Sequence, residues 1–195
     1  MTGLSRLGQL IDAFAPAEGA PPQNLRAFFR WALAGSWPML VLAAVMSSIA
    51  GMMEVVSALI LGRVIDAALA SDPASYFAAN APLLIACLGF YLVLRPIAFG
   101  GSSATNSIII GSNVLPLVLS RLHRWTLGQA VTFFDNDFAG RLATKQMQSA
   151  RAITDVVTEI INTGFFAMAS VIASVIYLIA IDAWIPQHVD FAMSP

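Results

Sequence analysis

Two ionisable residues, Glu54 and Arg95, lie inside long apolar stretches and are the first candidates for chemistry. An unpaired charge in lipid costs several kcal/mol, so such residues normally face protein or water and have a function. Here they either pair with one another or line a translocation cavity. Two simpler interpretations stay open: Arg95 extends its guanidinium toward the membrane interface, and Glu54 sits close to a membrane boundary.

The remaining reactive side chains do not form a recognisable catalytic or metal site. Cys87 is the single cysteine, which rules out an intramolecular disulfide and a thiolate metal cluster. His123 and His188 have no carboxylate or cysteine at ligand spacing. Lys145 is the only lysine, and the sequence has no G-x-x-x-x-G-K-S/T phosphate loop. We therefore expect no catalytic residue, cofactor or metal in this chain, and no ATP hydrolysis by this chain alone.

The composition indicates a membrane protein. Hydrophobic residues make up 58% of the chain, charged residues 11%, and the mean hydropathy is +0.77. Soluble domains carry roughly a quarter charged residues, and a soluble protein with so little charge would expose apolar surface and aggregate. The net charge of −1 argues neither for nor against nucleic acid by itself. The expected partner is the lipid bilayer, and no nucleic-acid partner is expected.

Three apolar stretches are long enough to cross a bilayer. The first covers about residues 38–61, and the third covers residues 160–181, which hold no charge. The second begins near Pro82 and, apart from Arg95, stays free of charge until Arg121. This second stretch is either one very long helix or a hairpin of two spans that turns at residues 100–103.

The positive-inside rule separates these two topologies, because Arg and Lys near span ends are retained on the cytoplasmic side. Arg26 and Arg30 place the N-terminus in the cytoplasm. A hairpin would leave the densest basic segment outside, whereas a single helix leaves it inside. We therefore predict an all-α polytopic protein with spans at about 38–61, 82–103 and 160–181, the second extending to 131 as a cytoplasmic projection. The basic segment contains Arg121, Arg124, Arg141, Lys145 and Arg151.

The N-terminal region divides into two parts. Residues 1–23 contain several prolines and are expected to form a flexible cytoplasmic N-terminus. Residues 24–37 place apolar side chains at helical spacing, with Arg26 and Arg30 on another face and two tryptophans suited to a membrane interface. We predict an interfacial elbow helix here; the alternative is a plain loop that leads into the membrane.

The segment between the second and third spans, residues 132–160, is the most specific feature. Asp135, Asn136 and Asp137 are good helix N-capping residues and Gly140 follows closely, so a short helix and a tight turn are expected. Two long helices would then be joined at their tip by a short transverse element; the alternative is a capped helical hairpin with no partner. The second helix has one mainly apolar face, made of Leu142, Gln146, Ala150, Ile153, Val157 and Ile160.

Two motifs resemble bacterial ATP-binding cassette (ABC) exporters. LILGRVIDAAL at residues 59–69 is similar to the end of their first transmembrane helix, and FFDNDFAGRLATK at residues 133–145 resembles their first intracellular loop. The resemblance covers about residues 24–181 and implies the N-terminal half of a type-1 exporter transmembrane domain. In that family the loop carries a coupling helix that docks on the nucleotide-binding domain. The implied coupling residues are Phe133, Phe134, Asp135, Asn136, Asp137, Phe138, Gly140 and Arg141, with Phe133 or Phe134 as the apolar anchor.

The resemblance implies a multi-pass protein of the plasma (inner) membrane that forms part of a substrate translocation pathway, with Glu54 and Arg95 as candidate pathway residues. ATP and Mg²⁺ would bind a nucleotide-binding domain outside these residues, and a second transmembrane half would complete a homo- or heterodimer. Residues 182–195 diverge from the family, whose further helices and ATPase domain do not follow, so we expect a truncated or frameshifted product. The alternative function is a complete three-span assembly or regulatory subunit without ATP coupling.

Overall fold

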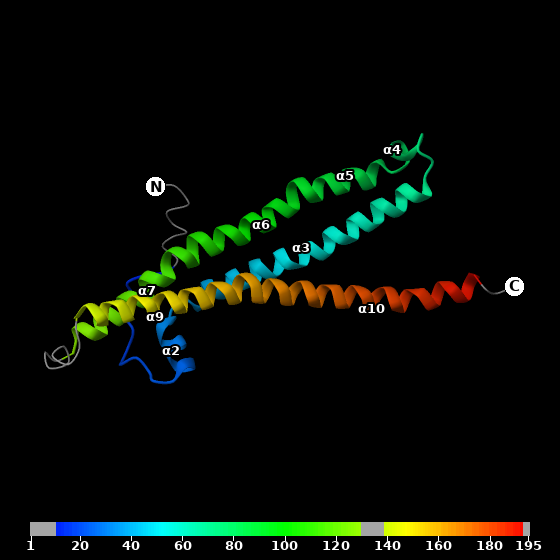
Figure 1. Cartoon of the computed structure of the whole chain (residues 1–195). Coiled ribbons are helices and arrows are strands. Elements are labelled where there is room, and N and C mark those ends of the chain that lie inside the picture. The colour runs from blue at the N-terminus through cyan, green and yellow to red at the C-terminus, as the bar shows by residue number, and fades with distance from the viewer. Residues whose placement is uncertain (1–10, 130–138, 193–195) are drawn as a thin grey trace. The chain divides into compact units, whose positions relative to one another are not determined.

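The computed structural model describes the backbone of residues 11–129 and 139–192, and the side chains of all of these except Ala139 and residues 182–192 (Figure 1). The described part of the chain contains helices, turns and bends and no strand. Three continuous helical stretches in it are long and apolar enough to cross a membrane, namely Trp37–Ala70, Ala81–Leu127 and Gly140–Ile181. The predicted fold class, an all-helical protein with three long apolar helices, is confirmed.

The helical elements follow one another with few interruptions. Three short π-helical turns, η1 to η3, interrupt the second and third long helices without ending them. The elements are α2 (Leu25–Ala32), α3 (Trp37–Ala70), α4 (Tyr76–Ala79), α5 (Ala81–Gly89), η1 (Phe90–Leu94), α6 (Arg95–Ala104), η2 (Thr105–Gly111), α7 (Ser112–Leu127), α9 (Ala139–Glu159), η3 (Ile160–Phe165) and α10 (Phe166–Ala192).

The second long helix runs without a turn through Gly100 and Gly101, so the hairpin alternative is wrong. Among the described residues, only Gly19 and Gly35 have a positive φ, and neither lies in this helix. The helix accommodates Pro96 by widening just before it: the Arg95 N–H donates to the Phe90 carbonyl five residues back. Because proline lacks an N–H, the preceding turn has one hydrogen bond fewer to keep it tight.

The predicted helix over residues 24–37 is shorter in the structure. α2 ends at Ala32, and residues 33–36 form a turn before α3 begins at Trp37. Gly35 has a φ of 83°, a left-handed conformation that glycine adopts without strain and that ends helices. α10, by contrast, continues to Ala192, past the predicted end of the third span.

The chain divides into two compact units, which are described separately. Unit 1 comprises Met1–Val45 and Ser102–Thr163, and unit 2 comprises Met46–Gly101 and Gly164–Pro195. The division passes through the long helices and therefore follows packing, not connectivity. The predicted partition into residues 1–23, 24–181 and 182–195 rests on the family resemblance and stays a prediction.

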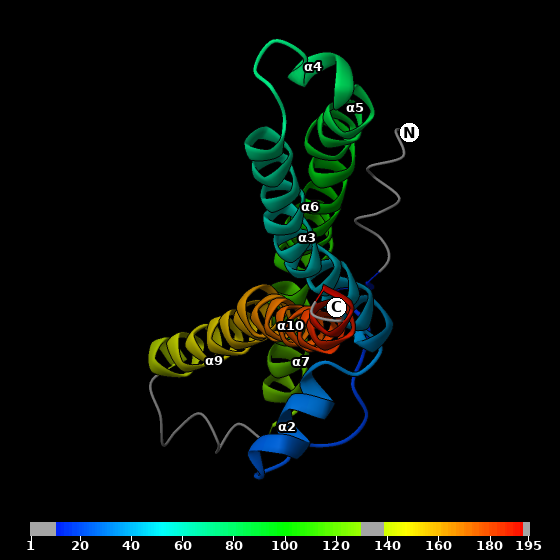
Figure 2. The ribbon, with the colours of Figure 1, turned by 90° about the vertical axis from the view of Figure 1, so that its right-hand side faces the viewer.

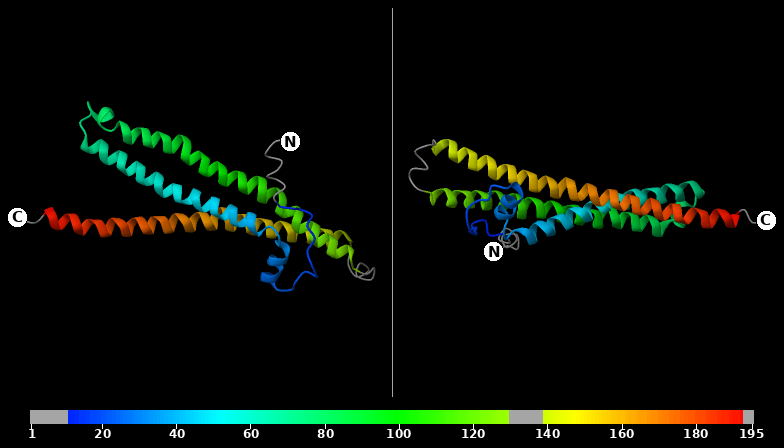
Figure 3. Two further views of the ribbon diagram at one scale, coloured as in Figure 1. Left: turned by 180° about the vertical axis from the view of Figure 1, so that it is seen from behind. Right: turned by 90° about the horizontal axis from the view of Figure 1, so that it is seen from below.

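The core of unit 1 is built mainly by α7 and α9, which run alongside each other (Figure 3), and is joined by apolar residues of α2, the start of α3 and η2. On α7 the buried apolar side chains recur three or four residues apart, as one helical face requires: Val114, Leu117, Val118 and Leu122. On α9 the predicted apolar face is present at Ala150, Ile153 and Val157. The helices are also joined at Thr126, whose Oγ1 accepts a hydrogen bond from Gln146 Nε2 at 2.6 Å.

The last residue predicted for that face, Ile160, is 53% exposed, and Ile161 is buried in its place. Ile160 is the first residue of η3, where the helix widens to a π-turn. In a regular α-helix Ile160 would follow Ile153 on the same face after two turns. Ile161 follows Val157 by four residues, which is also a spacing of one helical face.

In unit 2, α3 lies beside α5, η1 and α6, and α4 forms the turn between α3 and α5 at one end (Figure 2). α10 approaches α3 closely at Gly51, because a Cβ atom there would collide with the main-chain oxygen of Phe166. Phe166 also packs edge-on against Phe99, with ring centroids 6.4 Å apart. Small side chains at such crossings are typical of membrane helices, which pack by close contact.

Candidate functional site: an ion pair among apolar helices

The two ionisable residues singled out in the sequence, Glu54 and Arg95, lie opposite each other in unit 2. Glu54 is in the middle of α3, and Arg95 is the first residue of α6. Arg95 directly follows the π-turn η1, and its own main-chain N–H closes the last wide turn on Phe90. Because a π-turn rotates the residues after it around the helix axis, η1 sets the direction in which the Arg95 side chain points.

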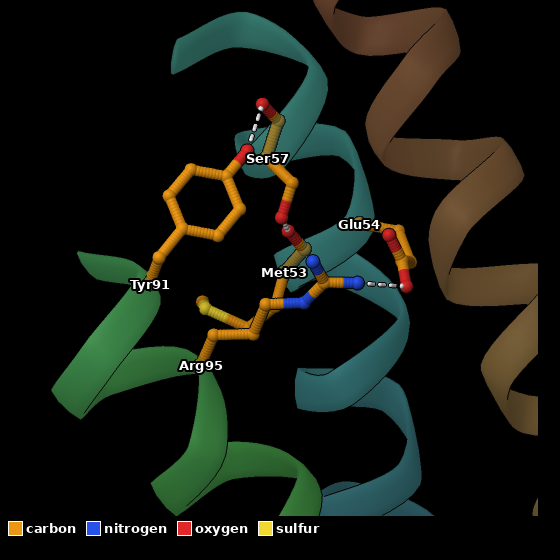
Figure 4. A network of polar contacts seen from close by, with 5 residues as sticks. All are labelled: Met53, Glu54, Ser57, Tyr91 and Arg95. Atoms are coloured by element: carbon orange, nitrogen blue, oxygen red, sulfur yellow. Dashed lines mark hydrogen bonds and ion pairs between the residues drawn. The ribbon is translucent and has the colours of Figure 1, made fainter. Parts of the chain in front are cut away.

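Glu54 and Arg95 form an ion pair (Figure 4). Arg95 Nη2 donates to Glu54 Oε1 at 2.8 Å, a charge-assisted hydrogen bond. The Arg95 side chain is 34% exposed and the Glu54 side chain is 41% exposed. The guanidinium carbon also lies 5.8 Å from the ring centroid of Tyr91 and 5.3 Å from that of Phe99, both within cation–π range. Of the interpretations left open by the sequence, the structure shows the mutual pairing.

A second polar contact joins the same helices one turn away. The Tyr91 hydroxyl donates to the Ser57 carbonyl at 3.0 Å, and the Ser57 hydroxyl donates to the Met53 carbonyl at 2.7 Å (Figure 4). Tyr91 precedes Arg95 by four residues and Ser57 follows Glu54 by three, so both pairs project from matching helical faces. Two adjacent contacts therefore fix the register of α3 against η1 and α6.

A groove of about 520 Å³ begins at Glu54 and follows α3 toward Asp66, with α10 as its other wall. The α3 wall includes Ala58 and Gly62, whose small side chains leave room, and the α10 wall carries polar groups of Ser170, Ser174 and Tyr177. This arrangement places carboxylate, guanidinium and hydroxyl groups along apolar surface. It can hold a polar group at membrane depth, but it holds no pair of acid and base groups around a nucleophile.

Most of the predicted coupling residues, Phe133 to Phe138, lie outside the described residues. Gly140 and Arg141 lie in the first turn of α9 and are exposed. Their predicted role in coupling stays a prediction.

The expectation that ATP and Mg²⁺ bind outside these residues stays a prediction. The sequence has no phosphate loop. Within the described ranges 11–129 and 139–192, no three His, Cys, Asp or Glu side chains are close enough to hold a metal ion.

Two residues that organise the structure were missed by the sequence analysis. Arg121 was counted only as a basic residue, yet it is 4% exposed and donates to main-chain carbonyls 87 to 106 residues earlier. Tyr91 likewise donates to a main-chain carbonyl. Every residue offers a carbonyl, so no side-chain pattern in the sequence marks such a partner.

Comparison with known proteins relates the chain to a transporter. No protein-family model and no solved structure matches it. It is 28% identical over 165 residues, 84% of its length, to an "Uncharacterized ABC transporter ATP-binding protein" of Haemophilus influenzae. The match covers 26% of that protein, so the chain spans about a quarter of the relative's length. The chain is thus a multi-pass membrane protein with a distant relationship to an ABC transporter.

Proposed function

We propose that this chain forms part of the transmembrane domain of an ATP-driven ABC exporter in the plasma (inner) membrane, with its N-terminus in the cytoplasm. The supporting observation is the joint presence of an ABC-transporter relative and the long α7–α9 pair. That pair leads to residues 130–138 at one end, the position of the predicted coupling loop. The nucleotide-binding domain, with its ATP and Mg²⁺, is supplied from outside these 195 residues.

The packing of α7 against α9 suits a lever that carries movement from the loop toward the membrane. The helices share a core of buried Val, Leu and Ile side chains, and Gln146 is hydrogen-bonded to Thr126 near the loop. Interdigitated side chains resist sliding, because each displacement opens voids and costs free energy. A force on the loop would therefore move the two helices together.

The groove that begins at Glu54, the carboxylate partner of Arg95, is the proposed contribution to the translocation pathway. An ion pair keeps its two charges at membrane depth at lower cost than two separate charges. A second transmembrane half, in a homo- or heterodimer, would complete the pathway.

Accessibility of engineered cysteines tests the topology. In a Cys87→Ala background, Asp137→Cys and Asp72→Cys variants are treated with a membrane-impermeant thiol reagent in intact cells and in inverted vesicles. Labelling of position 137 from the cytoplasmic side and of position 72 from outside is expected. Labelling of position 137 from outside would overturn the proposal, because a nucleotide-binding domain could not reach the loop.

Photo-cross-linking tests the coupling role itself. A photoreactive amino acid replaces Phe134 in one variant and, as a matched control, Phe77, which is 73% exposed in α4. The Phe134 variant is expected to capture a protein that contains a phosphate loop and binds ATP, and the Phe77 variant is not. Capture of no ATPase at position 134 would favour the assembly or regulatory subunit.

A further inference from the structure

Arg121 makes an unusual set of contacts in unit 1. Its Nε donates to the Ala15 carbonyl at 3.1 Å, and its Nη1 donates to the carbonyls of Trp31 and Ala32, both at 2.9 Å. Its Nη2 donates to the Ala34 carbonyl at 2.7 Å. These four contacts use most of the five N–H donors of a guanidinium. In the described part of the chain no carboxylate lies within ion-pair distance of Arg121.

The acceptors lie at the end of α2 or outside it, and the Trp31 carbonyl also accepts a hydrogen bond from the Ala34 N–H at 3.4 Å. Trp31 and Ala32 are the last two residues of α2, and the final carbonyls of a helix have no partner within it. Ala34 lies in the turn after α2, and Ala15 lies in the non-helical segment before it. A cation at a helix C-terminus also interacts favourably with the helix dipole. One side chain therefore satisfies the end of α2 and the segment that precedes it.

The neighbouring residue adds a further contact. The Ser120 Oγ lies 3.0 Å from the Ala13 carbonyl oxygen and 2.9 Å from that of Leu117 in its own helix, so its single proton is shared between them. Ile11 is buried in the core of unit 1. Residues 11–15 are thus held against α7 at two main-chain carbonyls, those of Ala13 and Ala15. α7 and α9 share one apolar core, so a segment that is attached to α7 is attached to the α7–α9 pair.

We propose that Arg121 is a positioning residue that clamps α2 and residues 11–15 onto α7, so that these segments follow any movement of the α7–α9 pair. Arginine suits this role because its planar fork reaches acceptors on several sides at once, whereas a lysine ammonium is a single point with three donors. The proposal concerns contacts within unit 1 and does not depend on transport activity or on a nucleotide-binding partner.

A buried cysteine reports whether the clamp is closed. Ser36 is fully buried, two residues after the last acceptor, and Ser36→Cys changes its volume little. Val157→Cys, on α9, is the reference position, since Val157 is 7% exposed in the same core. Both reporters are placed in the Cys87→Ala background, and the rate of thiol labelling is measured on the purified chain in lipid nanodiscs.

Arg121→Gln is expected to raise the labelling rate at position 36 by about tenfold or more, because a neutral amide with two donors leaves several buried carbonyls unsatisfied. The rate at position 157 should stay unchanged. Arg121→Lys should give a smaller rise at position 36. Arg124→Gln, on an exposed side chain one turn along α7, should change neither rate.

Two results would overturn the clamp. An unchanged rate at position 36 in Arg121→Gln would mean that the guanidinium does not hold the segment. An equal rise at positions 36 and 157 would mean that the whole unit opens and that Arg121 has no local role. If Arg121→Gln is not recovered as folded protein, Arg121→Lys is judged by the same two criteria.

Discussion

The two units of this protein bury their apolar side chains to very different extents. Among the described residues, nearly all buried apolar side chains belong to unit 1, and unit 2 contributes only Ala50, Phe90 and Ala169. Along α10, in unit 2, large apolar residues are exposed instead; Ile176 is 62% exposed and Ile179 is 63% exposed. Both units are helical, so the difference lies in what surrounds the helices.

This difference indicates two ways of keeping apolar surface away from water. α9 has one apolar face, packed against α7, and a polar opposite face, as expected of a helix that packs on protein. α10 carries no charge up to Ile181 and exposes large apolar side chains, as expected of a helix whose solvent is lipid. The same kind of substitution should therefore change the free energy of unfolding by different amounts in the two units.

The largest effect is expected in the core of unit 1. Leu117→Ala removes a side chain that is 1% exposed between packed helices, and should lower the free energy of unfolding by about 2–5 kcal/mol through lost contacts and a residual cavity. Leu88→Ala, at a position that is 58% exposed in unit 2, should change it by about 0.5 kcal/mol or less. Denaturant titration in bicelles measures both. Equal losses would contradict the contrast between the units.

A smaller effect is expected where unit 2 does pack tightly. The methyl group of Gly51→Ala would collide with the Phe166 main-chain oxygen and lie 3.1 Å from its carbonyl carbon. Moving α3 and α10 apart should cost about 1–3 kcal/mol in the same titration. Gly89→Ala is the control, because a Cβ atom there has nothing within 4 Å and alanine favours a helix. If Gly89→Ala lowers the free energy of unfolding as much as Gly51→Ala does, crowding against Phe166 is not the cause of the loss.

The sequence predicted the features that depend on composition and spacing. Three spans followed from the length of the apolar stretches, and the charge distribution favoured one helix through Gly100 over a hairpin. The apolar face of α9 followed from its period up to Val157. These features are encoded by side-chain type, which a sequence displays directly.

The features that the sequence did not predict depend on main-chain geometry. Ile161 and not Ile160 is buried where the π-turn η3 begins, and no residue type marks such a turn. The acceptors of Arg121 are carbonyls, which every residue has. For Glu54 and Arg95 the sequence left pairing and separate roles open, because it shows two charges and not the distance between them.

The smallest effect is expected from the ion pair between Glu54 and Arg95 in unit 2. Glu54→Gln and Arg95→Gln each leave one charge without its partner among apolar helices, so each should destabilise the protein. The double variant removes both charges and should lose less than the sum of the two single losses. Because both side chains are partly exposed, a coupling free energy of about 1 kcal/mol or less is expected.

Arg63 and Asp66 provide the matched control for this cycle. They carry the same charge types on α3, border the same groove and are exposed, but no ion pair joins them. Arg63→Gln and Asp66→Asn should therefore have nearly additive effects, within about 0.3 kcal/mol. If Glu54 and Arg95 are as additive as this pair, their contact contributes nothing to stability. The groove would then be the only reason to assign them a function.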